Sequence, residues 1–146
     1  MLPRPRRRRA VPLVPLLSVL PVALAGLVAA APGDAPRDAL TVLVSDPSGA
    51  RGTPSSSYEL RCEPAGGTHP DAAAACDRLD GFGRDGGDPF APVPEGQLCT
   101  QIYGGPATAR VVGTWHGRAV DASFNRRNGC EISRWRQLVP VLPDLG

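Results

Sequence analysis

The chain has 146 residues, a length that one compact domain can account for. It contains 16 arginines and no lysine against 14 acidic residues, but five of those arginines lie within the first nine residues. The rest of the chain therefore carries 11 basic and 14 acidic side chains, a slightly acidic balance that excludes an extended binding surface for DNA or RNA.

The first 31 residues have the organisation of a secretory signal peptide. The arginine-rich start is followed by the uncharged, Leu/Val/Ala-rich stretch Val11–Ala29 and by the small residues Ala29-Ala30-Ala31. A membrane anchor is the alternative, because about 20 apolar residues can span a bilayer. The three prolines of the stretch and its small-residue end favour cleavage, so we expect a secreted, extracellular protein without a membrane attachment. The expected segments are a cleaved signal peptide over 1–31, a flexible segment over 32–39 and a folded domain over 40–146.

Four cysteines follow this leader: Cys62, Cys76, Cys99 and Cys130. In the oxidising environment of an exported protein we expect two disulfides, whose pairing the residues alone leave open. A zinc site is the rival interpretation. The chain has no Cys-x-x-Cys pair, and His69 and His116 lack ligand spacing relative to any cysteine, so we expect no metal and no cofactor.

The first elements of the folded part are two strands and a helix. Leu40–Val44 is rich in Leu and β-branched residues, and Ser57–Cys62 alternates in polarity, so both are predicted strands. Pro64–Pro70 is a predicted loop. An Ala-rich helix is expected to run from Asp71, as its N-cap, through Leu79.

The stretch Asp80–Gly96 is so rich in glycine and proline that neither a helix nor a strand is expected there. An irregular segment longer than about 15 residues inside a compact domain is usually functional or disordered. This one leads directly into the extended segment Gln97–Tyr103, which contains Cys99. We therefore regard this part of the chain as the candidate functional loop.

A hairpin and a second helix complete the chain. Arg110–Trp115 and Arg118–Phe124 are predicted strands joined by a tight turn at His116-Gly117. Glu131–Leu138 is a predicted short helix that ends before Pro140. The expected fold class is α+β, with an antiparallel sheet of about five strands, two short helices and two disulfides.

No arrangement of residues typical of an enzyme stands out. A Ser-His-Asp triad would need His69, which precedes a proline in a turn, or His116, which lies at a hairpin tip. The sequence contains no phosphate-binding loop, no dinucleotide-binding fingerprint and no His-Glu-x-x-His motif. We expect a protein that is not an enzyme, with a small secreted hydrolase that uses an acidic pair as the alternative.

Several short motifs occur in a specific order along residues 40 to about 141. They are the strand ending at Cys62, Gly67-Thr68-His69-Pro70, Cys76, Cys99 with Ile102-Tyr103, Gly113-x-Trp115-x-Gly117, Asn128-x-Cys130-Glu131 and the apolar C-terminal tail. Each motif is weak alone, but together they resemble the Streptomyces subtilisin inhibitor family. The resemblance implies a five-stranded antiparallel sheet with two helices, the disulfides Cys62–Cys76 and Cys99–Cys130, and a homodimer.

The resemblance further implies that the chain inhibits subtilisin-type serine proteases by presenting a peptide bond in the manner of a substrate. Carried onto this sequence, the reactive bond joins Gln101 (P1) to Ile102 (P1′). The rest of the implied protease-contacting loop consists of Leu98 (P4), Cys99 (P3), Thr100 (P2) and Tyr103 (P2′). Asn128 is expected to support the loop by a hydrogen bond to its backbone.

Three features depart from the family. Thr100 stands where proline is common, Gly104-Gly105-Pro106 is one residue longer than the usual connection, and Gln101 is an uncommon P1 residue. Because Gln101 has no charge, we expect weak inhibition of trypsin-like enzymes, whose pocket forms a salt bridge with P1. Because Leu98 suits the apolar fourth subsite of subtilisins, we expect strong inhibition of subtilisin. An extracellular binding module that shares the fold without inhibiting proteases is the remaining alternative.

Overall fold

The computed structural model describes residues 38–49 and 55–146. The expected signal peptide over 1–31, and the expected flexible segment up to residue 37, lie outside the described residues. The first strand begins at Asp38, slightly before its predicted start. None of the helices in the described ranges is long and apolar enough to cross a bilayer.

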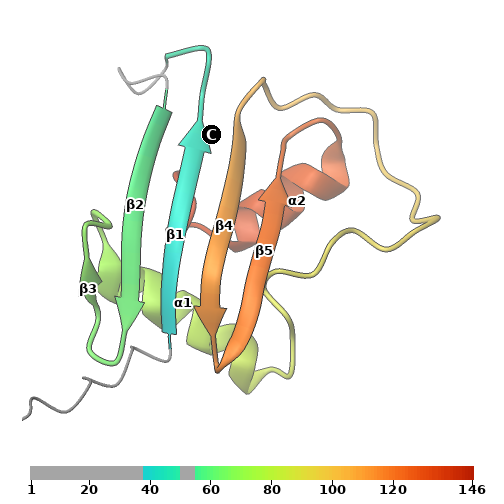
Figure 1. Cartoon of the computed structure of the whole chain (residues 1–146). Coiled ribbons are helices and arrows are strands. Elements are labelled where there is room, and N and C mark those ends of the chain that lie inside the picture. Colours follow the sequence, from blue (N-terminus) through green and yellow to red (C-terminus); the bar gives the residue numbers. More distant parts are fainter. Residues whose placement is uncertain (1–37, 50–54) are drawn as a thin grey trace, which may run out of the picture. The chain divides into compact units, whose positions relative to one another are not determined.

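Five antiparallel strands form one sheet in the order β3-β2-β1-β4-β5 (Figure 1). The strands are β1 (Asp38–Ser45), β2 (Ser55–Cys62), β3 (Gly66–Gly67), β4 (Thr108–Trp115) and β5 (Arg118–Phe124). The central strand β1 pairs along its whole length with β2 and along most of it with β4, while β4 and β5 form a hairpin. The predicted fold class is thereby confirmed, including the hairpin turn at His116-Gly117.

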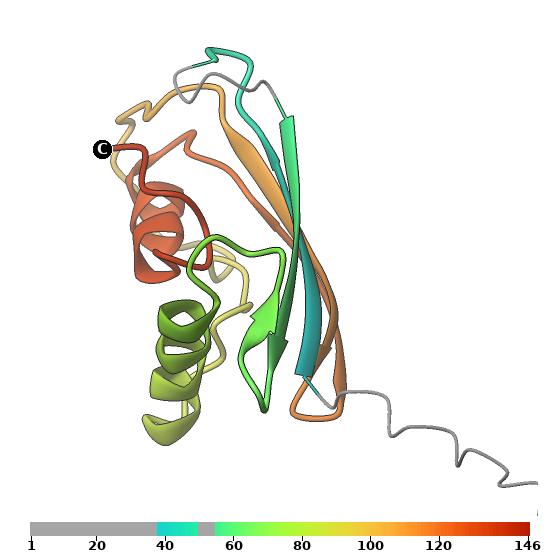
Figure 2. The ribbon, with the colours of Figure 1, turned by 90° about the vertical axis from the view of Figure 1, so that its left-hand side faces the viewer.

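Both helices, α1 (Ala72–Arg84) and α2 (Gly129–Gln137), cover the same face of the sheet (Figure 2). Successive side chains of a strand point to opposite faces, so Leu40, Val42 and Val44 of β1 all point to the covered face and are buried. The opposite face is not covered by either helix.

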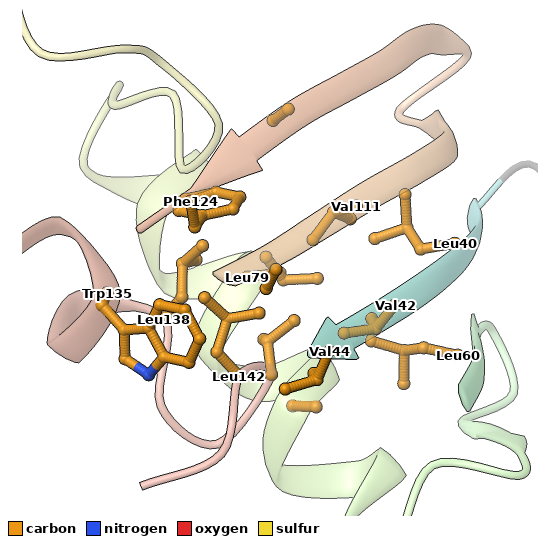
Figure 3. Packing of buried hydrophobic residues seen from close by; sticks show 14 of the residues in the cluster. Leu40, Val42, Val44, Leu60, Leu79, Val111, Phe124, Trp135, Leu138 and Leu142 are labelled. Carbon is orange, nitrogen blue, oxygen red and sulfur yellow. The ribbon is translucent and has the colours of Figure 1, made fainter. Parts of the chain in front are cut away.

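The hydrophobic core lies between the sheet and the two helices (Figure 3). Leu79 of α1, Trp135 of α2 and Phe124 of β5 are each 0–1% exposed. The chain after α2 contributes Leu138 and Leu142, which are fully buried. Truncating a large buried side chain to alanine typically costs about 2–5 kcal/mol. This packing fixes the position of α2, to which the candidate loop is attached by the disulfide Cys99–Cys130.

Strand β3 lies within Pro64–Pro70, which the sequence predicted to be a loop. Gly66–Gly67 pairs with β2 at the edge of the sheet. Gly67 has a φ of 102°, and a Cβ there would overlap the carbonyl oxygen of Glu59. The loop prediction was wrong for these residues because glycine has no strand propensity that a sequence pattern could show.

Helix α1 continues to Arg84, although Asp80–Gly96 was predicted to contain no helix. A glycine in a helix costs about 1 kcal/mol relative to alanine. This cost is offset by Phe82, which packs against the core and lies 5.1 Å from the guanidinium carbon of Arg78, measured to the ring centre. The prediction was wrong for residues 80–84 because tertiary packing outweighed local propensity.

The start of α1 also differs in detail from the prediction. Asp71 occupies the N-cap position, but its side chain makes no capping hydrogen bond. Its backbone amide instead donates to Nδ1 of His69 at 3.1 Å. The predicted position of the helix start was right, and the predicted side-chain cap was wrong.

Candidate functional site

The irregular segment between α1 and β4, residues 85–107, extends beyond the β5 edge of the sheet (Figure 1). Within it, Leu98, Ile102 and Tyr103 are 97%, 61% and 64% exposed. Leaving apolar surface in water costs about 25 cal/mol per Å². Large apolar side chains gathered on one exposed loop therefore indicate a contact surface.

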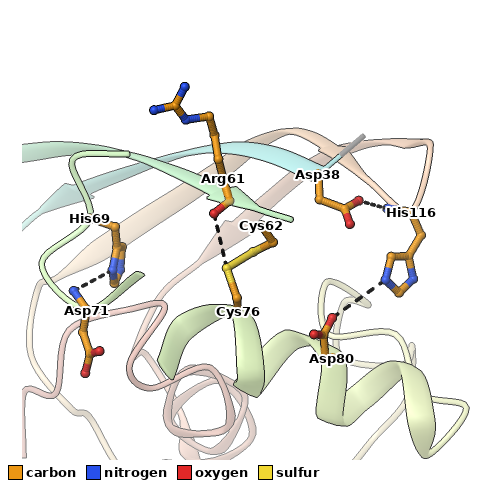
Figure 4. The surroundings of a disulfide bond; sticks show 8 residues. All are labelled: Asp38, Arg61, Cys62, His69, Asp71, Cys76, Asp80 and His116. Atoms are coloured by element: carbon orange, nitrogen blue, oxygen red, sulfur yellow. Dashed lines mark hydrogen bonds and ion pairs between the residues drawn. A yellow bond between two sulfur atoms is a disulfide. The ribbon is translucent and has the colours of Figure 1, made fainter. Parts of the chain in front are cut away.

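The disulfide Cys99–Cys130 ties this loop to α2, with the two Cα atoms 5.4 Å apart. Cys130 lies in the first turn of α2. The second disulfide, Cys62–Cys76, joins the end of β2 to α1 (Figure 4). These are the two pairings that the family resemblance implied.

A second attachment of the loop is at Thr100. The backbone amide of Gly129 donates to the carbonyl oxygen of Thr100 at 2.9 Å. A Cβ on residue 129 would overlap Oγ1 of Thr100, so only a glycine lets this threonine lie against the helix start. Sequence reasoning missed Gly129, because its importance arises from a contact with a residue far away in the chain.

A third attachment lies on the other side of the predicted reactive bond. The backbone amide of Gly104 donates to the carbonyl oxygen of Arg126 at 2.8 Å. A Cβ on residue 104 would approach Nε of Arg126 and Cγ1 of Ile132 to 2.9 Å. The first glycine of the longer Gly104-Gly105-Pro106 connection thus lies close against the body of the domain.

The attachments at Thr100 and Gly104 leave Gln101, Ile102 and Tyr103 exposed between them. The side-chain amide of Gln101 donates within the loop, to the carbonyl oxygen of Cys99 at 3.4 Å. The structure therefore presents the predicted bond on a short exposed stretch of backbone that is held on both sides.

Asn128 is close to the loop but contacts it indirectly. Its side-chain Oδ1 accepts a hydrogen bond from the backbone amide of Glu131 at 3.0 Å and so caps α2. The amide that reaches the loop is that of the next residue, Gly129. Any support that Asn128 gives to the loop would therefore act through the geometry of the helix start.

The two histidines have structural partners (Figure 4). Nε2 of His69 lies 3.1 Å from the carbonyl oxygen of Val141, and Nδ1 accepts a hydrogen bond from the backbone amide of Asp71, which Figure 4 shows. The ring of His116 stacks on Trp115, with ring centres 4.4 Å apart, and lies 4.0 Å from a carboxylate oxygen of Asp80. Within the described ranges, no group of three or more His, Cys, Asp or Glu residues could hold a metal ion.

One exposed ion pair has shifted pKa values. Arg110 of β4 donates to both carboxylate oxygens of Asp121 in β5, at 2.8 and 2.7 Å. These hydrogen bonds lower the pKa of Asp121 and raise the pKa of Arg110. Because both residues belong to strands, the pair is part of the scaffold and not of the loop.

The fold and the loop together define a disulfide-linked α+β domain with an exposed loop that is held on both sides. The family described as subtilisin inhibitor-like matches residues 37–128, which include the loop. "Subtilisin inhibitor-like protein 1" of Streptomyces cacaoi is 40% identical over 80 residues, covering 51% of this chain and 68% of that protein. The "Subtilase-type protease inhibitor" of Streptomyces coelicolor is 37% identical over 115 residues, covering 73% of this chain and 77% of that protein. The chain belongs to the subtilisin inhibitor-like family, whose members are protease inhibitors and not enzymes.

A solved structure is also similar to this chain. It is the complex of sermetstatin from Streptomyces caespitosus with Bacillus licheniformis subtilisin. The TM-score is 0.43 at 25% identity, over 70% of this chain and 96% of that chain.

Proposed function

We propose that this chain is a secreted, substrate-like inhibitor of subtilisin-type serine proteases and that Gln101–Ile102 is its reactive bond. The observation that carries the proposal is an exposed bond held on both sides, by Thr100 and the disulfide of Cys99 before it and by Gly104 after it. Membership of the family, together with relatives that are named as inhibitors of subtilisin-like proteases, supports the class of partner.

Attachment on both sides accounts for the inhibition. A serine protease binds its substrate as an extended strand, and a segment already held in shape loses little conformational entropy on binding. Attack by the catalytic serine on the carbonyl carbon of Gln101 forms an acyl ester, and the nitrogen of Ile102 leaves with a proton as a free amine. Because the amide of Gly104 is hydrogen-bonded to the carbonyl oxygen of Arg126, the amine of Ile102 stays beside the ester. It can then attack the ester carbon, re-form the peptide bond and release the serine.

The side chains of the loop account for the choice of protease. Gln101 is uncharged and offers no salt bridge to a trypsin-like pocket. Leu98 is 97% exposed and is free to enter an apolar fourth subsite. Thr100 lacks the rigidity of proline, and its hydrogen bond from Gly129 replaces part of that restraint.

Titration of subtilisin with the purified protein tests the proposal. We expect stoichiometric loss of protease activity, with slow cleavage confined to Gln101–Ile102. Turnover of a substrate by the chain itself, abolished by one Asp or Glu substitution, would instead indicate a hydrolase. Subtilisin activity that stays unchanged would leave a binding module as the function.

The P1 assignment has its own test. Gln101→Lys should produce inhibition of trypsin, because the new charge can pair with the acidic residue of the trypsin pocket. Gln97→Lys is the matched control, since it adds the same charge to an exposed position of the same loop. A gain from Gln97→Lys, or none from Gln101→Lys, would show that the reactive bond lies elsewhere.

We also propose a homodimer that associates through the uncovered sheet face. Leu43 of β1 is 40% exposed there, whereas its neighbours Val42 and Val44 are buried on the other face. A second copy packed on this face would remove Leu43 from water. Sedimentation of the wild-type chain should give twice the monomer mass, and Leu43→Asp should give the monomer while Gln97→Asp does not. A wild-type monomer at micromolar concentration would refute the proposal.

Export by the leader over residues 1–31 is proposed from the composition of that segment alone. Expression of the full chain in an exporting bacterium should release protein whose N-terminus lies near residue 32. Full-length chain retained in the membrane would contradict cleavage.

A further inference from the structure

Arg134 of α2 contacts the irregular loop upstream of the exposed segment. Residues four apart on a helix lie on the same side, so Arg134 faces the loop together with the disulfide-bonded Cys130. Nε of Arg134 donates to the carbonyl oxygen of Ala91 at 2.7 Å, and Nη2 donates to that of Phe90 at 3.2 Å. We call residues 88–91 the loop stem.

The rest of the domain holds the guanidinium from other directions. Nη1 of Arg134 donates to the carbonyl oxygen of Ser123 in β5 at 2.8 Å and to Oε2 of Glu131 at 3.3 Å. The guanidinium carbon lies 4.1 Å from the centre of the Phe124 ring. With an Arg134 side chain only 12% exposed, this planar group links β5, α2 and the loop stem in one geometry, which the single ammonium of a lysine would not reproduce.

Apart from Phe90, which packs against the core, the loop stem has few other contacts that restrain its backbone. The hydrogen bonds that the backbone amides of residues 88–97 donate are short-range. The amides of Phe90 and Ala91 donate to Asp88, and the amide of Gln97 donates to Pro94. In the described part of the chain, the hydrogen bonds that join residues 88–97 to a helix or strand all come from Arg134. One arginine thus takes the place of the strand pairing that this segment lacks.

We propose that Arg134 is a positioning residue for protease inhibition, an inference that rests on the proposed function. With Arg134 in place, the chain is anchored at Ala91 and again at Cys99, and the free stretch between them is short. Without it, the stem keeps the packing of Phe90 against the core but loses its hydrogen bonds to α2, so the segment that leads to Cys99 is less ordered and holding Leu98 against a protease costs more conformational entropy.

This role differs from that of the attachments around the reactive bond. Thr100 and Gly104 hold the two sides of Gln101–Ile102 and thereby control re-formation of the bond. Arg134 acts farther upstream. Its loss should therefore weaken the affinity for the protease while leaving the equilibrium between intact and cleaved inhibitor unchanged.

The test compares Arg134→Gln and Arg134→Lys with the wild-type chain. Arg136→Gln is the matched control, since it removes the same charge from an exposed position two residues along the same helix. For each protein, the measurements are the dissociation constant with subtilisin, the equilibrium ratio of cleaved to intact inhibitor, and hydrogen–deuterium exchange resolved by peptide. The last measurement distinguishes loosening of the loop from loss of the whole fold.

We expect Arg134→Gln to bind subtilisin about tenfold more weakly, with faster exchange confined to peptides from residues 85–98. Arg134→Lys should fall between this variant and the wild type, and Arg136→Gln should match the wild type. Unchanged affinity in Arg134→Gln, or faster exchange throughout the sheet, would overturn the proposal. If Arg134→Gln does not fold, Arg134→Lys carries the same comparison.

Inhibition of subtilisin and the exchange rate of the loop stem are measured independently. If neither the wild type nor Arg136→Gln inhibits subtilisin, the proposed function is wrong. Exchange in the loop stem would still report whether Arg134 positions it.

Discussion

The disulfides Cys62–Cys76 and Cys99–Cys130 are alike as cross-links but lie in different surroundings. They join residues separated by 14 and 31 positions, for which chain entropy gives about 3 and about 4 kcal/mol of stabilisation. Cys62 and Cys76 are 5% and 6% exposed between β2 and α1. Cys99 and Cys130 are half-buried, where the exposed loop meets the start of α2.

A cross-link matters most to function where the backbone around it has few other contacts. Strand β2 is paired with β1, and α1 is packed on the core, so both keep most of their contacts without Cys62–Cys76. Among the residues that the structure describes, the segment around the proposed reactive bond has no strand partner. It depends on Cys99–Cys130 and on a few hydrogen bonds. Stability and inhibition should therefore respond differently to the two bonds.

Removing each disulfide should produce the largest effects. We expect C62S/C76S and C99S/C130S to lose comparable stability, about 3–4 kcal/mol each. C99S/C130S should also bind subtilisin more weakly, on the order of a hundredfold, because the loop must then be ordered on binding. Inhibition constants are measured at a temperature where circular dichroism shows both variants folded. Equal loss of inhibition in the two folded variants would show that the loop depends no more on Cys99–Cys130 than on Cys62–Cys76.

A smaller substitution tests the same junction between the loop and α2. Gly129→Ala should weaken inhibition by about tenfold, because the new Cβ overlaps Oγ1 of Thr100 and displaces the loop. Adding Thr100→Ala removes that oxygen and should restore much of the inhibition. Ser133→Ala, at an exposed position of the same helix, is the control. Alanine has a higher helix propensity than glycine, so the substitution should not destabilise α2. Weaker inhibition would therefore not be explained by loss of folding. Failure of the double variant to recover would contradict the proposed contact.

Asn128 is expected to have a more modest role. Asn128→Ala removes the cap of α2, which typically costs about 1 kcal/mol, and should weaken inhibition a few-fold by loosening the amide of Gly129. Asn128→Asp keeps an acceptor oxygen and should resemble the wild type. Thermal unfolding and subtilisin titration are measured together. Full inhibition by Asn128→Ala would show that the loop does not depend on this cap.

The exposed pair of Arg110 and Asp121 should have the smallest effect. Because the pKa of Asp121 is lowered in the folded state, the pair stabilises the domain above the unfolded-state pKa, and this contribution is lost as the pH falls through the lower folded-state pKa. Asp121→Asn should cause a slight fall in melting temperature near neutral pH, none in strong acid, and no change in inhibition. Such exposed pairs are weak. A clear change in subtilisin binding would contradict this prediction and show that the ion pair of β4 and β5 affects the loop.

Local patterns were sufficient to predict β1, β2, the hairpin of β4 and β5 and the approximate positions of both helices, but not β3. Alternation marked β2, and the short connection at His116-Gly117 marked the hairpin. Composition also indicated where the irregular candidate loop lies. The pairing of the cysteines needed the family resemblance, because four cysteines alone are compatible with several pairings.

Contacts between distant residues could not be predicted. Gly66–Gly67 became a strand through the close approach of β2, and α1 continued past Asp80 because Phe82 packs on the core. Within the site, the contact of Gly129 with Thr100 and the bonds of Arg134 to the loop stem have no sequence signature.

The amino-acid sequence was enough to place four of the five strands, both helices and the irregular loop along the chain. The tertiary structure alone decided how that loop is held. The physical reason is that strand and helix preferences depend on neighbours in the chain, whereas the restraint of Gln101–Ile102 comes from residues after β5 and in α2 that reach the loop only once the core has formed.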